Sequence, residues 1–200
     1  LRKPRAETDQ IQLVYLGLME VVRGIDELLV ATALLRGNVP RITLLLIGSG
    51  RDEQLFRARA KALGLTSDEV EFAGYIPYAS AMERVATADI GLLPLHRNEH
   101  MDTTEPNKLF DYMSVGLPVV TSDTIPSARI IRAEKAGVVF SAGDAAALAT
   151  AVKSLIDPEV RRTMGENGRA AVQRSYNWQR DALALAGAVD AVHAQWSARK

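Results

Sequence analysis

Short apolar runs rich in β-forming residues alternate with amphipathic segments along most of this chain, and this alternation limits the possible folds more than any other feature. The runs occupy residues 11–17, 42–48, 70–76, 90–95, 118–123 and 137–141. Several have little polar alternation, which is typical of strands buried on both faces of a parallel sheet. The β-α-β-α order therefore predicts an α/β fold, a doubly wound parallel sheet with right-handed crossovers.

The segments between these runs show helical apolar spacing. We expect helices at residues 25–36, 52–65, 80–88, 107–116 and 144–156. Ser80 is followed three residues later by Glu83, as in a capping box, and Asp144 is placed to cap another helix. Beyond residue 157 the pattern becomes wholly helical, which predicts a helical C-terminal segment.

Composition excludes several classes of protein. Lys+Arg and Asp+Glu are equal at 24 each, so no overall positive field favours nucleic acid, and any anionic ligand must be bound by local groups. The absence of cysteine excludes disulfides and thiolate metal sites and suits a reducing compartment. No apolar run reaches the roughly 18 residues of a membrane helix. Because the chain starts at Leu1 rather than Met, we expect a fragment or a processed product.

A doubly wound sheet binds ligands beyond the carboxyl ends of its strands, near the point where the strand order reverses. The loops at this edge are expected to follow Gly17, Gly48, Gly74, Leu95 and Thr121. After the first of them, Arg23 and Gly24 open the next helix, where backbone amides favour phosphate and the arginine adds positive charge. An ordinary loop with a solvated arginine explains this segment about equally well.

The segment TTEPNKLFDYM, residues 103–113, brings a proline, a lysine and an acid to the start of one helix. Pro106 suits the first turn, and Lys108 and Asp111 are three residues apart and therefore share a face. A carboxylate accepts hydrogen bonds from sugar hydroxyls, while lysine and a helix N-terminus stabilise phosphate charge. Taken alone, an exposed Lys–Asp pair on an ordinary helix is the better interpretation.

Three further motifs carry less information. GSGR, residues 48–51, lacks the third glycine of a dinucleotide fingerprint, so a tight turn is favoured. Tyr75 and Ile76 are candidates for lining a planar base, but core and turn roles explain them equally well. His96 and His100 lie in a polar segment that is expected to border any cleft, and a metal site is disfavoured because further ligands are lacking.

In combination, these segments resemble the C-terminal, donor-binding half of a GT-B fold glycosyltransferase of family 4, the glycosyl transferases group 1. The likeness runs from about Val14 to Trp196. Its motifs, in chain order, are YLG with RG, GSGRDEQL, FAGYIPYASAMERVATADIGLLP, NKLFDYMSVGLPVVTSD and YNWQRDA. Their order and spacing together are hard to obtain by chance, although no single motif is decisive.

The resemblance implies a domain plan and a reaction. Residues 1–10 would be a linker or tail, residues 11–176 a Rossmann-like nucleotide-sugar-binding domain, and residues 177–200 a helix that crosses back to an N-terminal domain. It implies retaining transfer of a sugar from a UDP- or GDP-sugar to an acceptor glycan or lipid-linked sugar, without a metal or other cofactor. The acceptor would be bound by the N-terminal domain, so this chain alone is expected to be inactive. A cytoplasmic location is expected, with membrane association only in the full-length protein, at the inner face.

The resemblance also implies roles for individual residues. Arg23 and Lys108 would stabilise the diphosphate as the catalytic groups, and Asp111 would bind ribose. The other expected donor-binding residues are Gly17, Leu18, Gly24, Ile76 beside the base, Thr103 and Glu105 facing the sugar, Asn107 and Leu109. Two departures stand out: the family's paired glutamates are replaced by Thr103 and Asp111, and Leu18 stands where many members have a basic residue.

Alternative functions stay open at this point. A nucleotide-sugar 2-epimerase is built from the same two GT-B halves, and a non-catalytic regulatory module can share the doubly wound sheet. An NAD-dependent oxidoreductase is disfavoured by the incomplete glycine motif. The nucleobase, the sugar, the acceptor, the linkage, the oligomeric state and the replacement for the first glutamate are left open.

Overall fold

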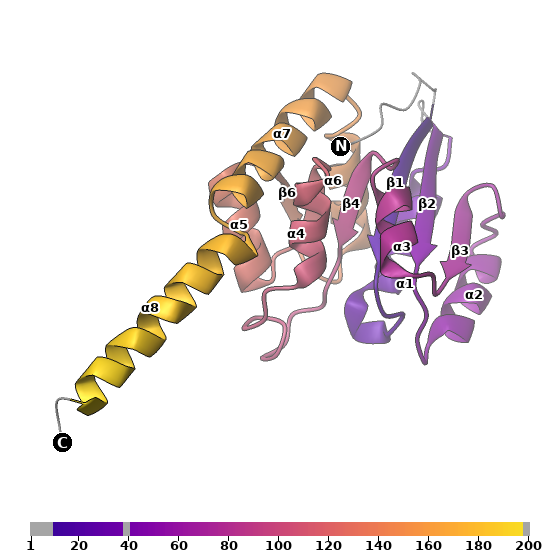
Figure 1. Ribbon diagram of the computed structural model, residues 1–200. Coiled ribbons are helices and arrows are strands. Elements are labelled where there is room, and N and C mark those ends of the chain that lie inside the picture. Colours follow the sequence, from indigo (N-terminus) through magenta and orange to yellow (C-terminus); the bar gives the residue numbers. More distant parts are fainter. Residues whose placement is uncertain (1–9, 38–40, 198–200) are drawn as a thin grey trace.

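The computed structural model describes residues 10–37 and 41–197, and its centre is a six-stranded sheet in which all neighbouring strands are parallel (Figure 1). Across the sheet the order is β3 (Val70–Gly74), β2 (Arg41–Ile47), β1 (Gln10–Leu16), β4 (Ile90–Leu93), β5 (Val119–Ser122) and β6 (Gly137–Phe140). This order reverses between β1 and β4, as in doubly wound nucleotide-binding sheets. The predicted fold class is therefore confirmed.

Helices connect the strands and form the C-terminal part of the chain. They are the 3-10 turn η1 (Val21–Arg23), α1 (Ile25–Leu34), α2 (Glu53–Ala62), α3 (Tyr78–Val85), α4 (Asn107–Ser114), α5 (Ile125–Glu134), α6 (Ala145–Lys153), α7 (Pro158–Arg174) and α8 (Trp178–Ser197). All five predicted helical segments contain a helix, and α5 is an addition that the sequence analysis did not expect. Most of the expected N-terminal tail lies outside the described residues, and Gln10 already belongs to β1.

Two expectations about helix starts had opposite outcomes. Asp144 caps α6 as predicted, since its carboxylate accepts a 2.8 Å hydrogen bond from the backbone N–H of Ala147. The expected cap at Ser80 is wrong. Helix α3 begins two residues earlier, at Tyr78, after Pro77, and no side chain caps it there. The fixed φ of Pro77, −54°, brings the chain into the helix without the capping box.

The sheet separates two apolar layers, because successive side chains of a strand point to opposite faces. On β1, Leu13 and Tyr15 pack with α1, α2 and α6, whereas Val14 packs with α3, α4, α5 and α7. The neighbouring strand β2 divides in the same way, with Leu44 in the first layer and Leu45 in the second. Burial on both faces explains why the strand sequences show so little polar alternation.

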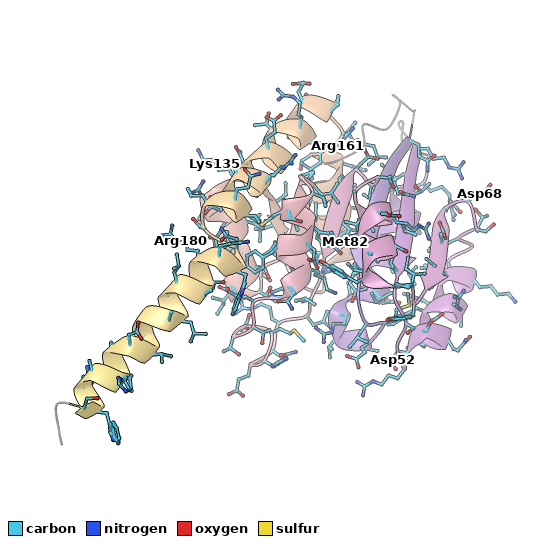
Figure 2. The ribbon with its side chains drawn as sticks, in the orientation of Figure 1. Asp52, Asp68, Met82, Lys135, Arg161 and Arg180 are labelled. Atoms are coloured by element: carbon cyan, nitrogen blue, oxygen red, sulfur yellow. The ribbon has the colours of Figure 1, made fainter. Side chains whose placement is uncertain are left out.

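Helix α8 leaves the body of the molecule after α7 and extends away from it (Figure 1). None of its residues is buried, and Figure 2 shows its side chains pointing outward along its length. Several large apolar side chains are among them: Trp178, Leu183, Leu185, Val189, Val192 and Trp196. Within residues 10–37 and 41–197, no helix combines the length and the apolar character needed to cross a membrane.

Candidate functional site

A cleft of about 640 Å³ opens at the carboxyl ends of β1, β2 and β3 and is bounded by the first turns of α3 and α4. It lies where the strand order reverses, which is where a doubly wound sheet binds its ligand. The loops after Gly17, Gly48, Gly74 and Leu95 supply its wall. The loop after Thr121, the fifth one expected at this edge, supplies none of the residues that line it.

Most of the residues expected at the site meet in this cleft. Those in its wall are Gly17, Leu18, Arg23, Ile76, Glu105, Asn107, Lys108 and Asp111. They come from segments far apart in the sequence, and the parallel sheet brings them to one edge. Gly24, Thr103 and Leu109 are not part of the wall.

Lys108 reaches from the first turn of α4 to the end of β1. Its Nζ lies 4.1 Å from the centroid of the Tyr15 ring, a cation–π distance. The Tyr15 hydroxyl donates a 2.7 Å hydrogen bond to the carbonyl of Leu18, which holds the ring in place. Gly17 has a φ of +142°, and a Cβ there would lie only 2.4 Å from Nζ. The backbone conformation therefore favours glycine at this position, and a side chain there would displace the ammonium.

The surroundings of the Lys108 ammonium disfavour its charged form. Burial lowers the pKa of Lys108 to about 7, the positive charge of Arg23 adds to this effect, and the Asp111 carboxylate opposes it. No hydrogen bond or ion pair joins the ammonium to another residue in the described part of the chain. Within the described residues, Lys108 thus has no anionic hydrogen-bond or ion-pair partner.

Arg23 is the second cation of the cleft and has only long contacts. Its Nη1 is 3.9 Å from the sulfur of Met101, and its Nε is 3.7 Å from a carboxylate oxygen of Glu20. Nε is buried and has no hydrogen-bond partner among the described residues. Two basic side chains that line one cleft form a site that favours an anion.

Asp111 lies on α4 one turn beyond Lys108 and makes one close contact. The hydroxyl of Tyr78, the first residue of α3, donates a 2.7 Å hydrogen bond to Asp111 Oδ1. This bond is the main reason why the pKa of Tyr78 is raised to about 12. Asp111 Oδ2 has no hydrogen-bond or ion-pair partner among the described residues. The acidic side of the cleft therefore has an acceptor available for a ligand.

Glu105 and Thr103 were expected to face the sugar, and both make other contacts. The Glu105 carboxylate lines the cleft but is ion-paired with Arg129 of α5. Thr103 is exposed, and its hydroxyl donates to the carbonyls of Glu99 and His100, at 2.9 and 3.0 Å. The geometry thus brings the Glu105 carboxylate, rather than the Thr103 hydroxyl, to the cleft.

Gly24 and Leu109 do not line the cleft, but they are buried next to the segments that do. Gly24 is buried with a φ of +72°, and a Cβ there would lie 1.9 Å from the carbonyl oxygen of Pro94. Leu109 is fully buried in the apolar layer beneath α4. These two residues hold the loop after β1 and the start of α4 against the sheet.

Several residues of the wall were not predicted as site residues from the sequence. They are Leu16, Ile47, Gly48, Ser49, Tyr75, Tyr78, Ala81, His100, Met101, Thr104 and Pro106. The sequence held a signal for several of them: Tyr75 was a candidate for the base, His100 was expected to border the cleft, and Gly48, Ser49, Thr104 and Pro106 belong to motifs discussed above. His96 does not line this cleft, and its Nε2 lies 2.8 Å from Glu27 Oε1. No cluster of three or more His, Asp or Glu side chains in the described residues could hold a metal ion.

Residues 1–171 match the family described as Glycosyl transferases group 1. A phosphatidyl-myo-inositol mannosyltransferase of Mycobacterium leprae is 32% identical over 137 residues, which cover 68% of this chain and 34% of that protein. A glycogen synthase of Mycobacterium tuberculosis is 27% identical over 188 residues, or 92% of this chain and 43% of that protein. The chain thus spans between a third and a half of the length of these relatives.

Solved structures share the fold. A sucrose-phosphate synthase from Thermosynechococcus elongatus has a TM-score of 0.83 at 27% identity, covering 94% of this chain and 46% of that one. The Anabaena protein Alr3699/HepE, solved in complex with UDP, has a TM-score of 0.73 at 21% identity, covering 90% of this chain and 49% of that one. The resemblance to the C-terminal half of GT-B glycosyltransferases is confirmed, and the chain belongs to the glycosyl transferases group 1 family.

Proposed function

We propose that this chain is the donor-binding half of a retaining glycosyltransferase, which transfers a sugar from a nucleoside-diphosphate sugar to an acceptor bound by another domain. The observation that carries the proposal is the cleft lined by two basic side chains, Lys108 and Arg23, next to the Asp111 carboxylate. Family membership supports glycosyl transfer as the reaction. The UDP complex of Alr3699/HepE, a protein of the same fold, supports a nucleotide ligand.

The two cations suit the chemistry of the leaving group. When the bond between the anomeric carbon and the phosphate oxygen breaks, its electron pair leaves with the diphosphate. The sugar gains oxocarbenium character, and the acceptor hydroxyl oxygen then bonds to the anomeric carbon while its O–H bond breaks and the proton passes to the departing diphosphate oxygen. Fixed positive groups facing the diphosphate stabilise this transition state more than the ground state. Lys108 and Arg23, which line the cleft, would provide them.

The rest of the donor would extend along the cleft. Asp111 would accept hydrogen bonds from the ribose, Ile76 would border the base, and Glu105 would face the sugar if its pairing with Arg129 yields. Leu18 supplies no charge, so the diphosphate site would depend on Arg23 and Lys108. We propose that this reaction requires no metal ion or other cofactor.

Helix α8 supports the proposal of a second domain. It is 20 residues long, none of them buried, and it exposes Trp178, Leu185 and Trp196. Exposed apolar side chains on a long helix need a partner surface. We propose that an N-terminal domain covers this helix, binds the acceptor and completes the site by closing over the donor.

Calorimetric titration with UDP, GDP and ADP tests the donor site. We expect at least one of them to bind with a Kd below about 1 mM, and Arg23→Ala to weaken this binding at least roughly tenfold, because a charge-assisted contact is lost. Arg162→Ala is the matched control, since this exposed arginine of α7 lies outside the cleft and, among the described residues, pairs with Glu159 and Glu166. A folded chain that binds none of the three nucleotides at millimolar concentration would contradict the proposal.

A further inference from the structure

We propose that Tyr78 and Asp111 together recognise the ribose of the nucleotide, with Tyr78 acting as the positioning residue for the Asp111 carboxylate. This inference rests on the proposed function and adds to it a role for Tyr78, to which the sequence analysis assigned none. The observation behind it is the 2.7 Å hydrogen bond from the Tyr78 hydroxyl to Asp111 Oδ1. Both residues line the same cleft.

The bond joins two separate helices at the mouth of the cleft. Tyr78 is the first residue of α3, which follows β3, and Asp111 lies on α4, which follows the long loop after β4. The Tyr78 side chain is 63% exposed, so packing does not hold it beside Asp111. The hydrogen bond itself therefore fixes the orientation of both side chains.

The length of Asp111 explains why such support is needed. An aspartate carries its carboxylate on a single methylene, one fewer than a glutamate, so it reaches less far into the cleft. A short carboxylate that rotates freely would be a poor acceptor for a ligand held further out in the cleft. By donating to Oδ1, Tyr78 fixes the carboxylate and leaves Oδ2 without a partner among the described residues. Ligand recognition depends on this kind of preorganisation.

The pair also presents the acceptors that a ribose requires. A ribose carries two neighbouring hydroxyls, and each can donate one hydrogen bond. Asp111 Oδ2 can accept one of them. The Tyr78 oxygen, having donated its own hydrogen to Oδ1, keeps lone pairs that can accept the other. Phosphate is a poor fit here because the negative charge of Asp111 repels it, whereas Lys108 and Arg23 attract it.

The decisive measurement is the discrimination between ribonucleotides and their 2′,3′-dideoxy analogues. We would titrate UDP, GDP, 2′,3′-dideoxy-UDP and 2′,3′-dideoxy-GDP into the wild-type chain, Tyr78→Phe and Asp111→Asn. We expect Tyr78→Phe to weaken binding of the preferred ribonucleotide roughly tenfold, since a hydrogen bond to a charged group is lost. Binding of its dideoxy analogue should change less than about twofold. Asp111→Asn should abolish the same discrimination, and the double variant should be no worse than Asp111→Asn alone.

Tyr176→Phe is the matched control, because the Tyr176 hydroxyl donates a 3.2 Å hydrogen bond to Glu134 outside the cleft. It should leave all four affinities unchanged. Unchanged discrimination in Tyr78→Phe overturns the inference, and so does an equal loss for ribonucleotide and dideoxy analogue, which would show a merely structural role. If the wild-type chain binds neither UDP nor GDP, the proposed function itself fails and the inference fails with it.

Discussion

Replacing Lys108 by methionine should abolish measurable nucleoside-diphosphate binding and, at the same time, raise the free energy of unfolding at pH 7. Methionine retains an apolar stem over the Tyr15 ring but removes the ammonium that would face the diphosphate. We expect an affinity loss of at least ~100-fold. The stability gain should be about 1 to 3 kcal/mol, because the native state no longer buries a cation that has no anionic partner among the described residues.

Two measurements check this prediction together. Calorimetry with UDP and GDP reports the binding loss, and urea unfolding at pH 7 reports the stability gain. Lys153→Met is the control, since Lys153 is exposed at the end of α6 and should change neither quantity by much. A Lys108→Met chain that binds nucleotide as tightly as wild type, or that unfolds more easily, would show that the ammonium is not in the environment described here.

The same lysine makes stability and binding depend on pH in opposite directions. The pKa of Lys108 is about 7 in the fold against an ordinary value of 10.5, so between these pH values the unfolded chain binds more protons than the native one. The Lys108 contribution to the free energy of unfolding therefore rises with pH across this window, and Lys108→Met should lack that rise. The fixed charges that face the ammonium are Arg23, which lowers its pKa, and Asp111, which raises it.

Diphosphate binding should weaken over the same pH window. A bound diphosphate raises the pKa of Lys108, so above pH 7 the complex takes up a proton that the free protein lacks. Affinity should fall by up to about tenfold for each pH unit above 7, until the pKa of the complex is reached. Titrations at pH 7, 8 and 9 in buffers of different ionisation enthalpy would measure both the affinity and the proton uptake. Equal affinity at all three values would contradict this linkage.

Replacing Gly24 by alanine should destabilise the chain by about 3 to 5 kcal/mol, among the largest costs of any single substitution. The backbone at Gly24 has a φ of +72°, a conformation that costs an alanine about 1 kcal/mol or more. In addition, the new Cβ would lie 1.9 Å from the carbonyl oxygen of Pro94, which is backbone and cannot move aside alone. The loop after β1 would have to separate from the end of β4.

Gly64→Ala separates the two contributions. Gly64 has a similar φ of +67°, but no atom lies within 4 Å of the position that its Cβ would take. It should therefore cost only about 1 kcal/mol, the price of the conformation alone. Urea unfolding of both variants gives the comparison. Equal losses for Gly24→Ala and Gly64→Ala would show that the Pro94 contact is relieved without cost.

The sequence predicted the strands, the fold class and the edge of the sheet where the cleft lies. This was possible because strands buried on both faces consist mainly of apolar residues, which are visible in the sequence. It also placed Lys108 and Asp111 on one helix face, since that relation is local. The bond between Tyr78 and Asp111 could not be predicted, because it joins residues 33 positions apart that meet only after β3 and β4 have taken their places in the sheet. Sequence spacing carries no information about such a contact.

Two errors concern helices that begin beside a proline. Helix α5, IPSARIIRAE, was not expected, although Pro126 lies in its first turn, where proline is a usual start signal. Ser80 satisfied the capping-box pattern, but Pro77 starts the helix earlier by its backbone geometry alone. In both cases a proline opens the helix, and the side-chain signals of a helix start are absent or misleading.

The ladder between β1 and β4 has consequences for how the chain folds. It contains only two register pairs, Leu13 with Ile90 and Val14 with Gly91, fewer than any other neighbouring strands of the described sheet share. On either side of it, three strands come from one continuous stretch, residues 10–74 or residues 90–140. We expect each half-sheet to assemble first, from contacts between residues close in the sequence. The pairing of β1 with β4 should form last, because it joins residues that are far apart in the sequence. Gly17 and Lys108 belong to different halves of the sheet, so the part of the cleft where they meet would form only in that last step.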